Sequence, residues 1–215
     1  MSYNPHLDQP LGYAGAPLNQ ARGAVIAMHG RDWVPEDILS VCRRIGLDDV
    51  AWLAPAAHEN TWYPNPFTAP LEDNEPSLSW TLERIQTLVD EVMAHGIAPE
   101  HIVLLGFSQG ACAVAEYAVR HARRYGGIVI FTGGVMGPSD TQRNYGGGFA
   151  GTPAFVGGSR EDEWISEARM RETRDLLRSM GAEVSDHFYS GCDHFVTDAE
   201  VTAARVIIQG LRAAA

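Results

Sequence analysis

The chain has 215 residues, of which 45% are hydrophobic and 20% charged, and its formal net charge is −11 at pH 7. This length allows one substantial hydrophobic core, so we expect a single domain spanning residues 1–215. Its lysines and arginines form no basic stripe, which argues against binding to nucleic acid or to an anionic membrane surface.

The sequence contains no segment that is typical of membrane insertion or of a secretory signal. It has no run of about eighteen apolar residues, and residues 1–6 lack a basic region followed by an apolar stretch. We therefore expect a cytoplasmic protein without stable membrane insertion. Cys42, Cys112 and Cys192 are widely spaced, which argues against a disulfide framework and against a cysteine metal site. We expect Cys112 to pack in the core and Cys192 to be passive.

The N-terminal part of the chain has little pattern until residue 24. Residues 1–22 are polar and contain prolines, so we expect a loosely structured arm with an edge strand near residues 11–13. The apolar run at 24–28 predicts the first buried strand, which ends at His29 and Gly30.

A helix and a second strand come next, followed by a long irregular segment. Apolar positions recur at helical spacing over 35–45, Gly46 ends that helix, and the run at 50–54 predicts another buried strand. Residues 56–76 are rich in aromatic residues and prolines, and irregular segments of this length inside a compact domain are typically functional. Helical spacing resumes over 78–93.

The middle of the chain is predicted as strand, helix and strand. Residues 102–105 read as a buried strand, the helix-forming run 111–124 follows, and 127–131 is the next buried strand. A glycine-rich loop at 133–151 then leads to a strand at 153–156.

The last predicted elements are a helix at 164–180, a more exposed strand at 183–189, and a helix from about 198 to 213 with a capping box at Thr197. Strand and helix therefore alternate from residue 24 onward. This alternation predicts an α/β fold with a mostly parallel sheet and helices on both faces. Ligands are expected at the carboxyl ends of the strands.

Gly106, Ser108 and Gly110 form a G-x-S-x-G motif between the strand at 102–105 and the helix at 111–124. In this context the glycines let strand and helix approach closely, so the turn holds the Ser108 hydroxyl out toward a substrate. Free amides at the start of the helix point to the same place. We predict Ser108 as a nucleophile; the alternative is an ordinary glycine-rich turn in which Ser108 caps the helix.

A serine nucleophile needs a base, most often a neutral histidine from another strand end. His194 lies between the strand at 183–189 and the capping box at Thr197, so it is the predicted base. The alternative is a loop histidine that is hydrogen-bonded to backbone. His29 has a competing interpretation as a second catalytic histidine, but its position at the end of a buried strand favours a role in bracing its loop.

A carboxylate must orient the histidine and stabilise its charged form. Glu161, Asp162 and Glu163 follow one another in the loop after the preceding strand, and at most one of them is needed. Asp193 is adjacent to His194, where its side chain ordinarily points elsewhere. An acid from the first group gives the chain order serine, acid, histidine that is expected of an α/β-hydrolase.

An acyl-transfer site also needs two amide donors for the developing oxyanion. One is predicted to be the backbone N–H of Gln109, directly after Ser108. The other is expected in the loop after the first strand, where Gly30 lets the backbone turn close to the site, and we assign it to the N–H of Arg31.

Four motifs in this order resemble the phospholipase/carboxylesterase family, which includes acyl-protein thioesterases and small bacterial carboxylesterases. They are His29-Gly30, Gly106-Phe107-Ser108-Gln109-Gly110-Ala111, Gly158-Ser159-Arg160-Glu161-Asp162 and Gly191-Cys192-Asp193-His194. The resemblance covers residues 22–212 and implies an α/β-hydrolase fold with a minimal lid, as well as frequent homodimers. It implies Ser108, Asp162 and His194 as the catalytic residues, with the Arg31 and Gln109 amides as the oxyanion hole.

The choice of Asp162 rests on the family pattern, in which the acid follows a strand ending in glycine and precedes an apolar position by two or three residues. Two departures from the pattern are present. Residues 31–33 replace the usual HGLGD-type loop, and Glu163 stands where a proline usually follows the acid. These departures leave the reaction class unchanged and argue against a long-chain thioesterase.

Apolar side chains in loops at the catalytic edge are candidate substrate-binding residues, although each has the alternative role of covering the core. They are Trp33, Trp62, Tyr63, Phe67, Leu71, Met136, Trp164 and Phe195. As a group they indicate small apolar or aryl substrates. The expected function is a serine carboxylesterase that hydrolyses a small-molecule ester, or a thioester, without a metal or cofactor.

Two other functions remain open at this point. A dienelactone-hydrolase-like lactonase, or a hydrolase of aromatic-degradation products, would share the fold, but such enzymes usually carry cysteine where this chain has Ser108. A non-catalytic binding protein of the same fold would commonly lack one of the three catalytic residues.

Overall fold

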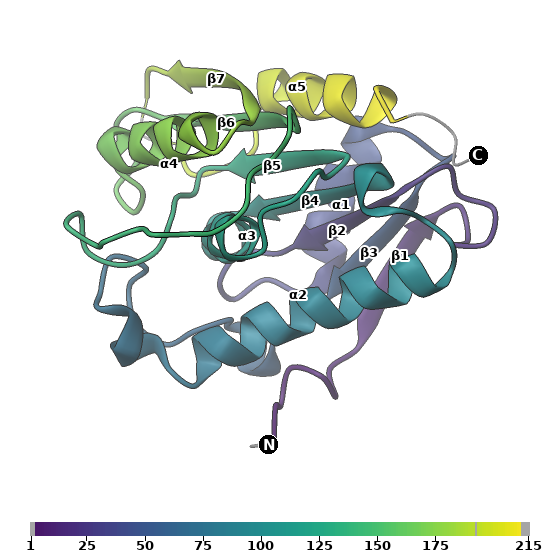
Figure 1. The fold of residues 1–215 in the computed structure, drawn as a ribbon, viewed down its shortest axis with the longest axis horizontal. Coiled ribbons are helices and arrows are strands. Elements are labelled where there is room, and N and C mark those ends of the chain that lie inside the picture. Colours follow the sequence, from purple (N-terminus) through teal and green to yellow (C-terminus); the bar gives the residue numbers. More distant parts are fainter. Residues whose placement is uncertain (1–2, 192, 212–215) are drawn as a thin grey trace.

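One mixed sheet forms the centre of the molecule (Figure 1). The computed structural model describes residues 3–191 and 193–211. Within these residues, the sheet has seven strands in the order β1-β3-β2-β4-β5-β6-β7. They are β1 (Leu11–Gly15), β2 (Ala24–Met28), β3 (Ala51–Pro55), β4 (Ile102–Phe107), β5 (Gly127–Phe131), β6 (Pro153–Ser159) and β7 (Glu183–Tyr189). Only β1 is antiparallel to its neighbour, so the predicted mostly parallel α/β fold is confirmed.

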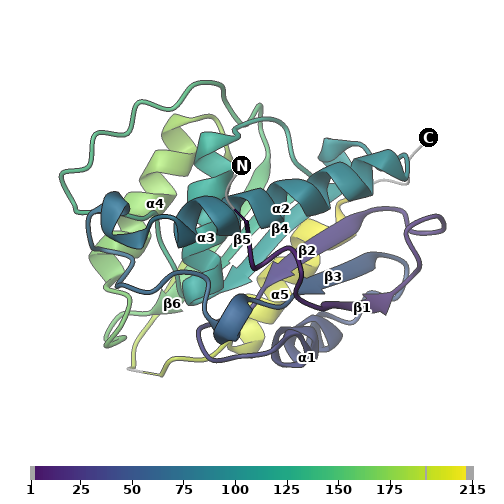
Figure 2. The same cartoon turned by 90° about the horizontal axis from the view of Figure 1, so that it is seen from below.

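Helices cover both faces of this sheet, as Figures 1 and 2 show. The helices α1 (Pro35–Ile45) and α5 (Asp198–Gln209) pack together on one face. The other face is covered by α2 (Ser77–Ala94), α3 (Gln109–Arg120) and α4 (Glu167–Ser179). Short 3-10 helices lie at His58–Asn60, Leu71–Asn74 and Pro99–His101. Within the described residues, no helix is both long and apolar enough to cross a membrane.

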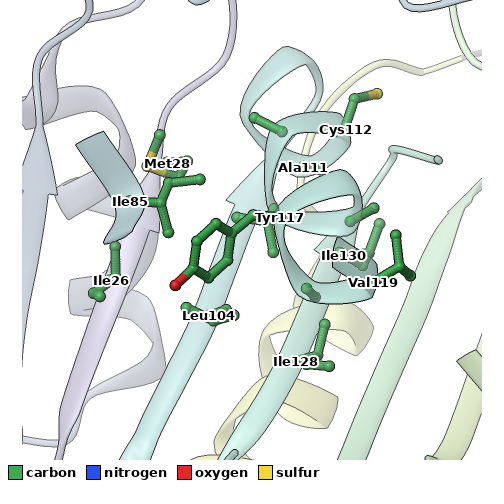
Figure 3. Packing of buried hydrophobic residues seen from close by; sticks show 14 of the residues in the cluster. Ile26, Met28, Ile85, Leu104, Ala111, Cys112, Tyr117, Val119, Ile128 and Ile130 are labelled. Atoms are coloured by element: carbon green, nitrogen blue, oxygen red, sulfur yellow. The ribbon is translucent and has the colours of Figure 1, made fainter. Parts of the chain in front are cut away.

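The two faces carry two hydrophobic layers because successive side chains of a strand point in opposite directions. On β2, Val25 and Ala27 pack with α1 and α5, whereas Ile26 and Met28 pack with α2 and α3. Figure 3 shows the second layer, with the ring of Tyr117 among aliphatic side chains between α3 and the sheet. The Tyr117 hydroxyl donates a hydrogen bond of 2.7 Å to a glutamine of α2. This layer fixes α3, which begins directly after β4, against the sheet.

The cysteines follow the expected pattern where they are described. Cys42 and Cys112 are free thiols and are buried, and Cys112 packs in the layer of Figure 3, as predicted. Cys192 lies outside the described residues.

Two predicted helices are shorter than their sequence pattern indicates. α3 ends at Arg120 rather than at 124, because the chain turns early into β5, where the Gly126 amide donates to the carbonyls of Pro99 and Ile102. α5 ends at Gln209, and the predicted positions 212 and 213 lie outside the described residues.

The segment between β6 and α4 also differs from the prediction. β6 continues to Ser159 instead of ending at 156, and α4 begins at Glu167 instead of 164. The side chain of Asp162 accepts hydrogen bonds from the amides of Trp164 and Ile165, which keeps these residues in a turn. The Ser166 hydroxyl then caps the helix, as a short polar side chain commonly does.

The N-terminal arm is ordered over residues 3–22, which corrects the prediction of a loose structure for this part of residues 1–22; Met1 and Ser2 lie outside the described residues. The expected edge strand is present as β1. Before it, Asn4 and His6 are buried, and the Asn4 side chain donates to the Trp80 carbonyl and to Glu83 on α2. These polar side chains hold the arm through hydrogen bonds, so the absence of an apolar pattern did not mean an absence of structure.

The buried His6 lies at the junction of the arm, the 56–76 segment and α2. Its Nδ1 accepts a hydrogen bond of 3.0 Å from the His58 amide, and its Nε2 faces the Trp62 carbonyl at 3.3 Å. The pKa of His6 is lowered to about 4, mainly by burial; the Trp62 carbonyl acts against this shift, and the nearby His58, Arg84 and His29 add to it. His6 is therefore neutral in the folded protein at pH 7.

We predict that this histidine makes the protein less stable in mild acid. In the unfolded chain His6 titrates near 6.5, so between that pH and about 4 the unfolded state binds the extra proton. Stability should fall as pH falls through this window, by about 2 kcal/mol after allowance for solvent screening. Urea unfolding of the wild type and His6→Gln between pH 4 and 7 should give a flatter pH dependence for the variant.

The matched control is His95→Gln, because His95 is exposed at the end of α2. This variant should keep the slope of the wild type. Equal slopes for the wild type and His6→Gln would contradict the prediction.

Candidate active site

Ser108 occupies a sharp turn between β4 and α3. Its backbone angles, φ 53° and ψ −120°, lie outside the regions that non-glycine residues favour. Its amide donates a hydrogen bond of 3.0 Å to the carbonyl of Phe131 at the end of β5. This strained turn is the geometry expected of a nucleophile elbow, and the side chain is only partly buried.

The glycines that flank Ser108 are required by close contacts between backbones. A Cβ on Gly106 would lie 2.5 Å from the Gly110 carbonyl oxygen. A Cβ on Gly110 would lie 2.4 Å from the carbonyl oxygens of both Met28 and His29, at the end of β2. Such distances are far below normal contact, so only glycine allows α3 to start this close to the sheet.

The side chains of Ser108, His194 and Asp162 form one continuous chain of hydrogen bonds. The Nε2 atom of His194 lies 2.8 Å from the Ser108 hydroxyl oxygen, and its Nδ1 lies 2.7 Å from Oδ2 of Asp162. A carboxylate can only accept from Nδ1–H, which leaves Nε2 unprotonated and able to accept the serine proton. The three residues come from the loops after β4, β7 and β6.

Asp162 differs from the neighbouring acids in burial and in hydrogen bonding. Its side chain is fully buried, and its second oxygen, Oδ1, accepts from the amides of Trp164 and Ile165 at 2.8 Å each. Glu161, Glu163 and Asp193 are exposed. Among the described residues, Asp162 is therefore the one of these four acids that accepts a hydrogen bond from His194.

Aromatic rings support the histidine, and this feature was not predicted. The ring of Phe107 packs against His194, with centroids 5.1 Å apart, and stacks on Trp33 at 4.6 Å. Phe107 lies between Gly106 and Ser108 in the motif. Its aromatic side chain at this position was the sequence signal from which the contact with the histidine could have been predicted. Trp33 therefore lies behind the site rather than in a substrate cleft.

His29 is buried and braces its loop, as expected. Its Nε2 accepts a hydrogen bond of 3.1 Å from the Ala57 amide, which assigns the proton to Nδ1, 2.7 Å from the Gly30 carbonyl. Burial lowers the pKa of His29 and keeps it neutral. Both ring nitrogens are engaged with backbone, so His29 is not arranged as a second base.

The two predicted oxyanion donors belong to segments that lie next to Ser108. Gln109 is the first residue of α3, so its amide has no acceptor within the helix. A Cβ on Gly30 would lie 3.5 Å from the Cβ of Ser108, so the loop that continues into Arg31 passes next to the serine. Among the described residues none accepts a hydrogen bond from the Arg31 amide.

Three of the predicted substrate-binding residues line a cleft of about 290 Å³, whose wall includes Gln109, the residue directly after Ser108. These are Tyr63, Phe67 and Trp164. Arg31 and Gln109 also line the cleft, together with Pro64, Asn65, Pro66, Thr68, Cys112 and Ile165. The walls are mainly apolar, and Trp164, which is 68% exposed, stands at the edge.

The other predicted substrate-binding residues lie elsewhere, which corrects those predictions. Trp33 and Phe195 line a separate groove of about 370 Å³ beside α1. Trp62 and Met136 are completely buried, and their backbone amides donate hydrogen bonds to buried side chains. The Trp62 amide donates to the side chain of Gln109, and the Met136 amide donates to a buried glutamate of α3. Leu71 is half-buried over the 133–151 loop.

A larger groove, of about 650 Å³, lies at the opposite end of the sheet. It is lined by residues 13–19 together with Ala51, Glu91 and His95. Ala51 is the first residue of β3, so this groove opens at the amino ends of the parallel strands. None of the predicted site residues lies in it, and its size therefore does not make it the candidate active site.

Comparison with known proteins shows the family of this chain. The sequence pattern that describes the phospholipase/carboxylesterase family matches residues 16–211. The chain belongs to the phospholipase/carboxylesterase family. As a member, it is a serine hydrolase of the carboxylesterase and thioesterase type with an α/β-hydrolase fold.

Three relatives illustrate the range of this family. The crystal structure of a phospholipase/carboxylesterase from Dyadobacter fermentans is 38% identical, with a TM-score of 0.89, and the match covers 94% of this chain and 97% of that one. The probable carboxylesterase SOBER1-like of Arabidopsis thaliana is 23% identical over 200 residues, which are 85% of this chain and 76% of that protein. Acyl-protein thioesterase 1 of Gibberella zeae is 24% identical over 147 residues, covering 64% of this chain and 59% of that protein.

We predict that Gly110→Ala will be strongly destabilising in this family member. In an open helix, glycine to alanine usually stabilises by about 0.5 to 1 kcal/mol. Here the new methyl group would collide with the carbonyls of Met28 and His29, so we expect a loss of about 3 kcal/mol or more in unfolding free energy.

Urea unfolding measures this change, with Gly146→Ala as the control. A Cβ on Gly146 would meet no atom of the described residues within 4 Å, so its variant should stay within about 0.5 kcal/mol of the wild type. A Gly110→Ala protein as stable as the wild type would show that the close approach at the turn is not required.

Proposed function

We propose that the chain is a serine carboxylesterase that hydrolyses small apolar or aryl carboxylic esters through an acyl-enzyme. The observation that carries this proposal is the hydrogen-bond chain from the Ser108 hydroxyl through His194 to Asp162, at 2.8 and 2.7 Å. Membership of a family of ester and thioester hydrolases supports the same reaction class.

In the proposed first half-reaction, Oγ of Ser108 attacks the carbonyl carbon of the ester while Nε2 of His194 takes the hydroxyl proton. The carbonyl oxygen becomes an oxyanion, and the amides of Arg31 and Gln109 donate to it. The tetrahedral intermediate then collapses, the bond to the leaving oxygen breaks, and His194 gives its proton to that oxygen. The products are an alcohol and an acyl group on Ser108.

In the second half-reaction a water molecule replaces the alcohol. His194 takes a proton from this water, whose oxygen attacks the acyl carbon, and the same amides hold the second oxyanion. Collapse returns the proton to Ser108 and releases the carboxylic acid. Each step of this proposed cycle uses only protein groups and water.

Asp162 would keep His194 in the productive tautomer throughout this cycle. Two backbone amides hold Oδ1, so the carboxylate cannot rotate away from the imidazole without losing both hydrogen bonds. The developing imidazolium also gains an adjacent negative charge in a buried position.

The cleft that Gln109 lines supports a small and uncharged substrate. Its volume of about 290 Å³ lies just below the roughly 300 to 1,000 Å³ that is typical of small-molecule sites. The guanidinium of Arg31, the cation at this cleft, donates to Thr61 and to the carbonyls of Tyr63 and Pro64. We therefore propose neutral esters with short to medium acyl chains as substrates. Homodimer formation and a cytoplasmic location stay predictions.

We predict that turnover depends on Ser108. Initial rates should be measured with p-nitrophenyl esters of increasing acyl length, and with acyl-CoA and lysophospholipid substrates, for the wild type and Ser108→Ala. The wild type should prefer the shorter p-nitrophenyl esters because the cleft is small. The variant should lose about a thousandfold or more in kcat, since the covalent route is removed.

A fluorophosphonate probe provides an independent measurement. It should label the wild type at Ser108 and leave Ser108→Ala unlabelled, whereas a binding protein would not react. Activity in Ser108→Ala close to that of the wild type would exclude the proposed mechanism.

We also predict that only one of the three adjacent acids is essential. Asp162→Asn should lower kcat by about 10³ to 10⁴, because an amide group no longer selects the histidine tautomer. Glu161→Gln and Glu163→Gln are matched controls on exposed side chains and should retain activity within about threefold. Equal losses in the three variants would mean that another group serves as the acid.

A further inference from the structure

Residues 61–64, which we call the bridge segment, contact both predicted oxyanion donors. The segment belongs to the irregular stretch between β3 and α2. Arg31 reaches it through its guanidinium, whose Nη1 donates to the Thr61 hydroxyl at 3.2 Å. The Nη2 atom of Arg31 donates to the carbonyls of Tyr63 and Pro64, at 2.8 and 3.1 Å.

Gln109 contacts the same segment from the other side of the cleft. Its Oε1 accepts from the Trp62 amide at 2.9 Å, and its Nε2 donates to the Tyr63 carbonyl at 2.7 Å. The Tyr63 hydroxyl returns a hydrogen bond of 3.3 Å to the Gln109 carbonyl. These side chains are buried, so their hydrogen bonds are shielded from competing water.

One atom is therefore shared by the two contacts. The carbonyl oxygen of Tyr63 accepts from both Arg31 and Gln109, using its two lone pairs. The residues whose backbone amides face the expected oxyanion are thus joined to each other through a single acceptor.

The loop that carries Arg31 needs such support. Asp32 has a left-handed backbone with φ 62°, and its amide donates to the carbonyl of Asn60, which is itself left-handed with φ 56°. Left-handed conformations are unfavourable for residues other than glycine, so contacts with the surroundings must maintain them. Arg31 directly precedes Asp32 and is exposed. The hydrogen bonds from its guanidinium to the bridge segment are contacts of this kind.

We propose that the side chains of Arg31 and Gln109 are positioning residues that set the spacing of the two oxyanion amides by binding the shared carbonyl of Tyr63. This proposal rests on the proposed function and assigns to the two side chains a role separate from that of their backbone amides. It also assigns to the bridge segment a role in the rate of the chemical step. Loss of either side chain lets the backbone of one donor move relative to that of the other, and the oxyanion is then held less well.

The main competing role for Arg31 is direct binding of a substrate anion. That role predicts a change in KM for anionic substrates only, whereas positioning predicts a change in kcat for a neutral ester. A purely structural role predicts a change in thermal stability with kcat per folded molecule preserved. Measurements on a neutral p-nitrophenyl ester with phenylboronic acid as a tetrahedral analogue separate the three.

The experiment compares Arg31→Met, Gln109→Met and the double variant. Each substitution leaves the backbone amide in place and removes the side-chain hydrogen bonds. We expect kcat on p-nitrophenyl butyrate to fall about tenfold or more in each single variant, with KM within about twofold of the wild type, since removing a whole donor costs about 10² to 10³. The inhibition constant of phenylboronic acid should rise in the same proportion as kcat/KM falls.

The double variant tests the shared acceptor. If both side chains act through one carbonyl, the kcat of the double variant should be within about twofold of the kcat of the less active single variant. Losses that multiply would show two independent effects and would overturn the proposal. So would kcat values within twofold of the wild type in both single variants, or a rise in KM with kcat unchanged.

Two further variants keep the test decisive. Arg205→Met is the matched control, because the Arg205 guanidinium also binds two backbone carbonyls, those of Ile45 and Arg44, in a region that contains none of the site residues. It should retain the wild-type kcat. Arg31→Lys, which keeps the charge but has a single donor group, should fold if Arg31→Met does not and should show an intermediate kcat; full wild-type kcat in Arg31→Lys would contradict the proposal.

Failure of this inference is distinguishable from failure of the proposed function. Normal kcat in the Arg31 and Gln109 variants, together with an inactive Ser108→Ala protein, rejects the positioning role alone. Activity that survives Ser108→Ala rejects the underlying mechanism.

Discussion

The contact between the first turn of α3 and the end of β2 is the constraint on which the site depends. Gly110 approaches the carbonyls of Met28 and His29 so closely that no side chain fits between them. This contact places Ser108 in a strained turn and leaves the amide of Gln109 free at the helix start. It also brings the loop after β2 next to the serine, so one packing contact holds the proposed nucleophile and the proposed oxyanion donors close together.

Much of this arrangement is predictable because a parallel sheet gathers its strand ends at one edge. The buried strands and the glycine-flanked serine follow from local pattern, and His194 follows from its place after the last strand. Asp162 needed the family pattern, because composition alone does not separate it from Glu161 and Glu163. Its turn with Trp164 and Ile165 looks helical in sequence, since apolar spacing carries no information about a side chain that accepts from the backbone.

Predictions failed where polar contacts distant in sequence decide the structure. Trp62 lies in an irregular segment without periodicity, so nothing local shows that its indole donates to the His29 carbonyl and that the residue is buried. The N-terminal arm looked unpatterned for the same reason. His6 and His29 both pack against the Trp62 ring, at 5.3 and 4.8 Å, which links the arm to the loop beside the serine.

Tyr63 takes part both in the wall of the cleft and in the contact with Arg31 and Gln109. Tyr63 lines the cleft, while its carbonyl accepts hydrogen bonds from the side chains of Arg31 and Gln109. In the proposed mechanism, the shape of the cleft and the stabilisation of the transition state thus depend on the same short stretch of backbone. Insertions or proline substitutions in residues 61–64 then change both together, whereas substitutions of Phe67 and Trp164, whose side chains border the cleft outside this stretch, change its shape alone.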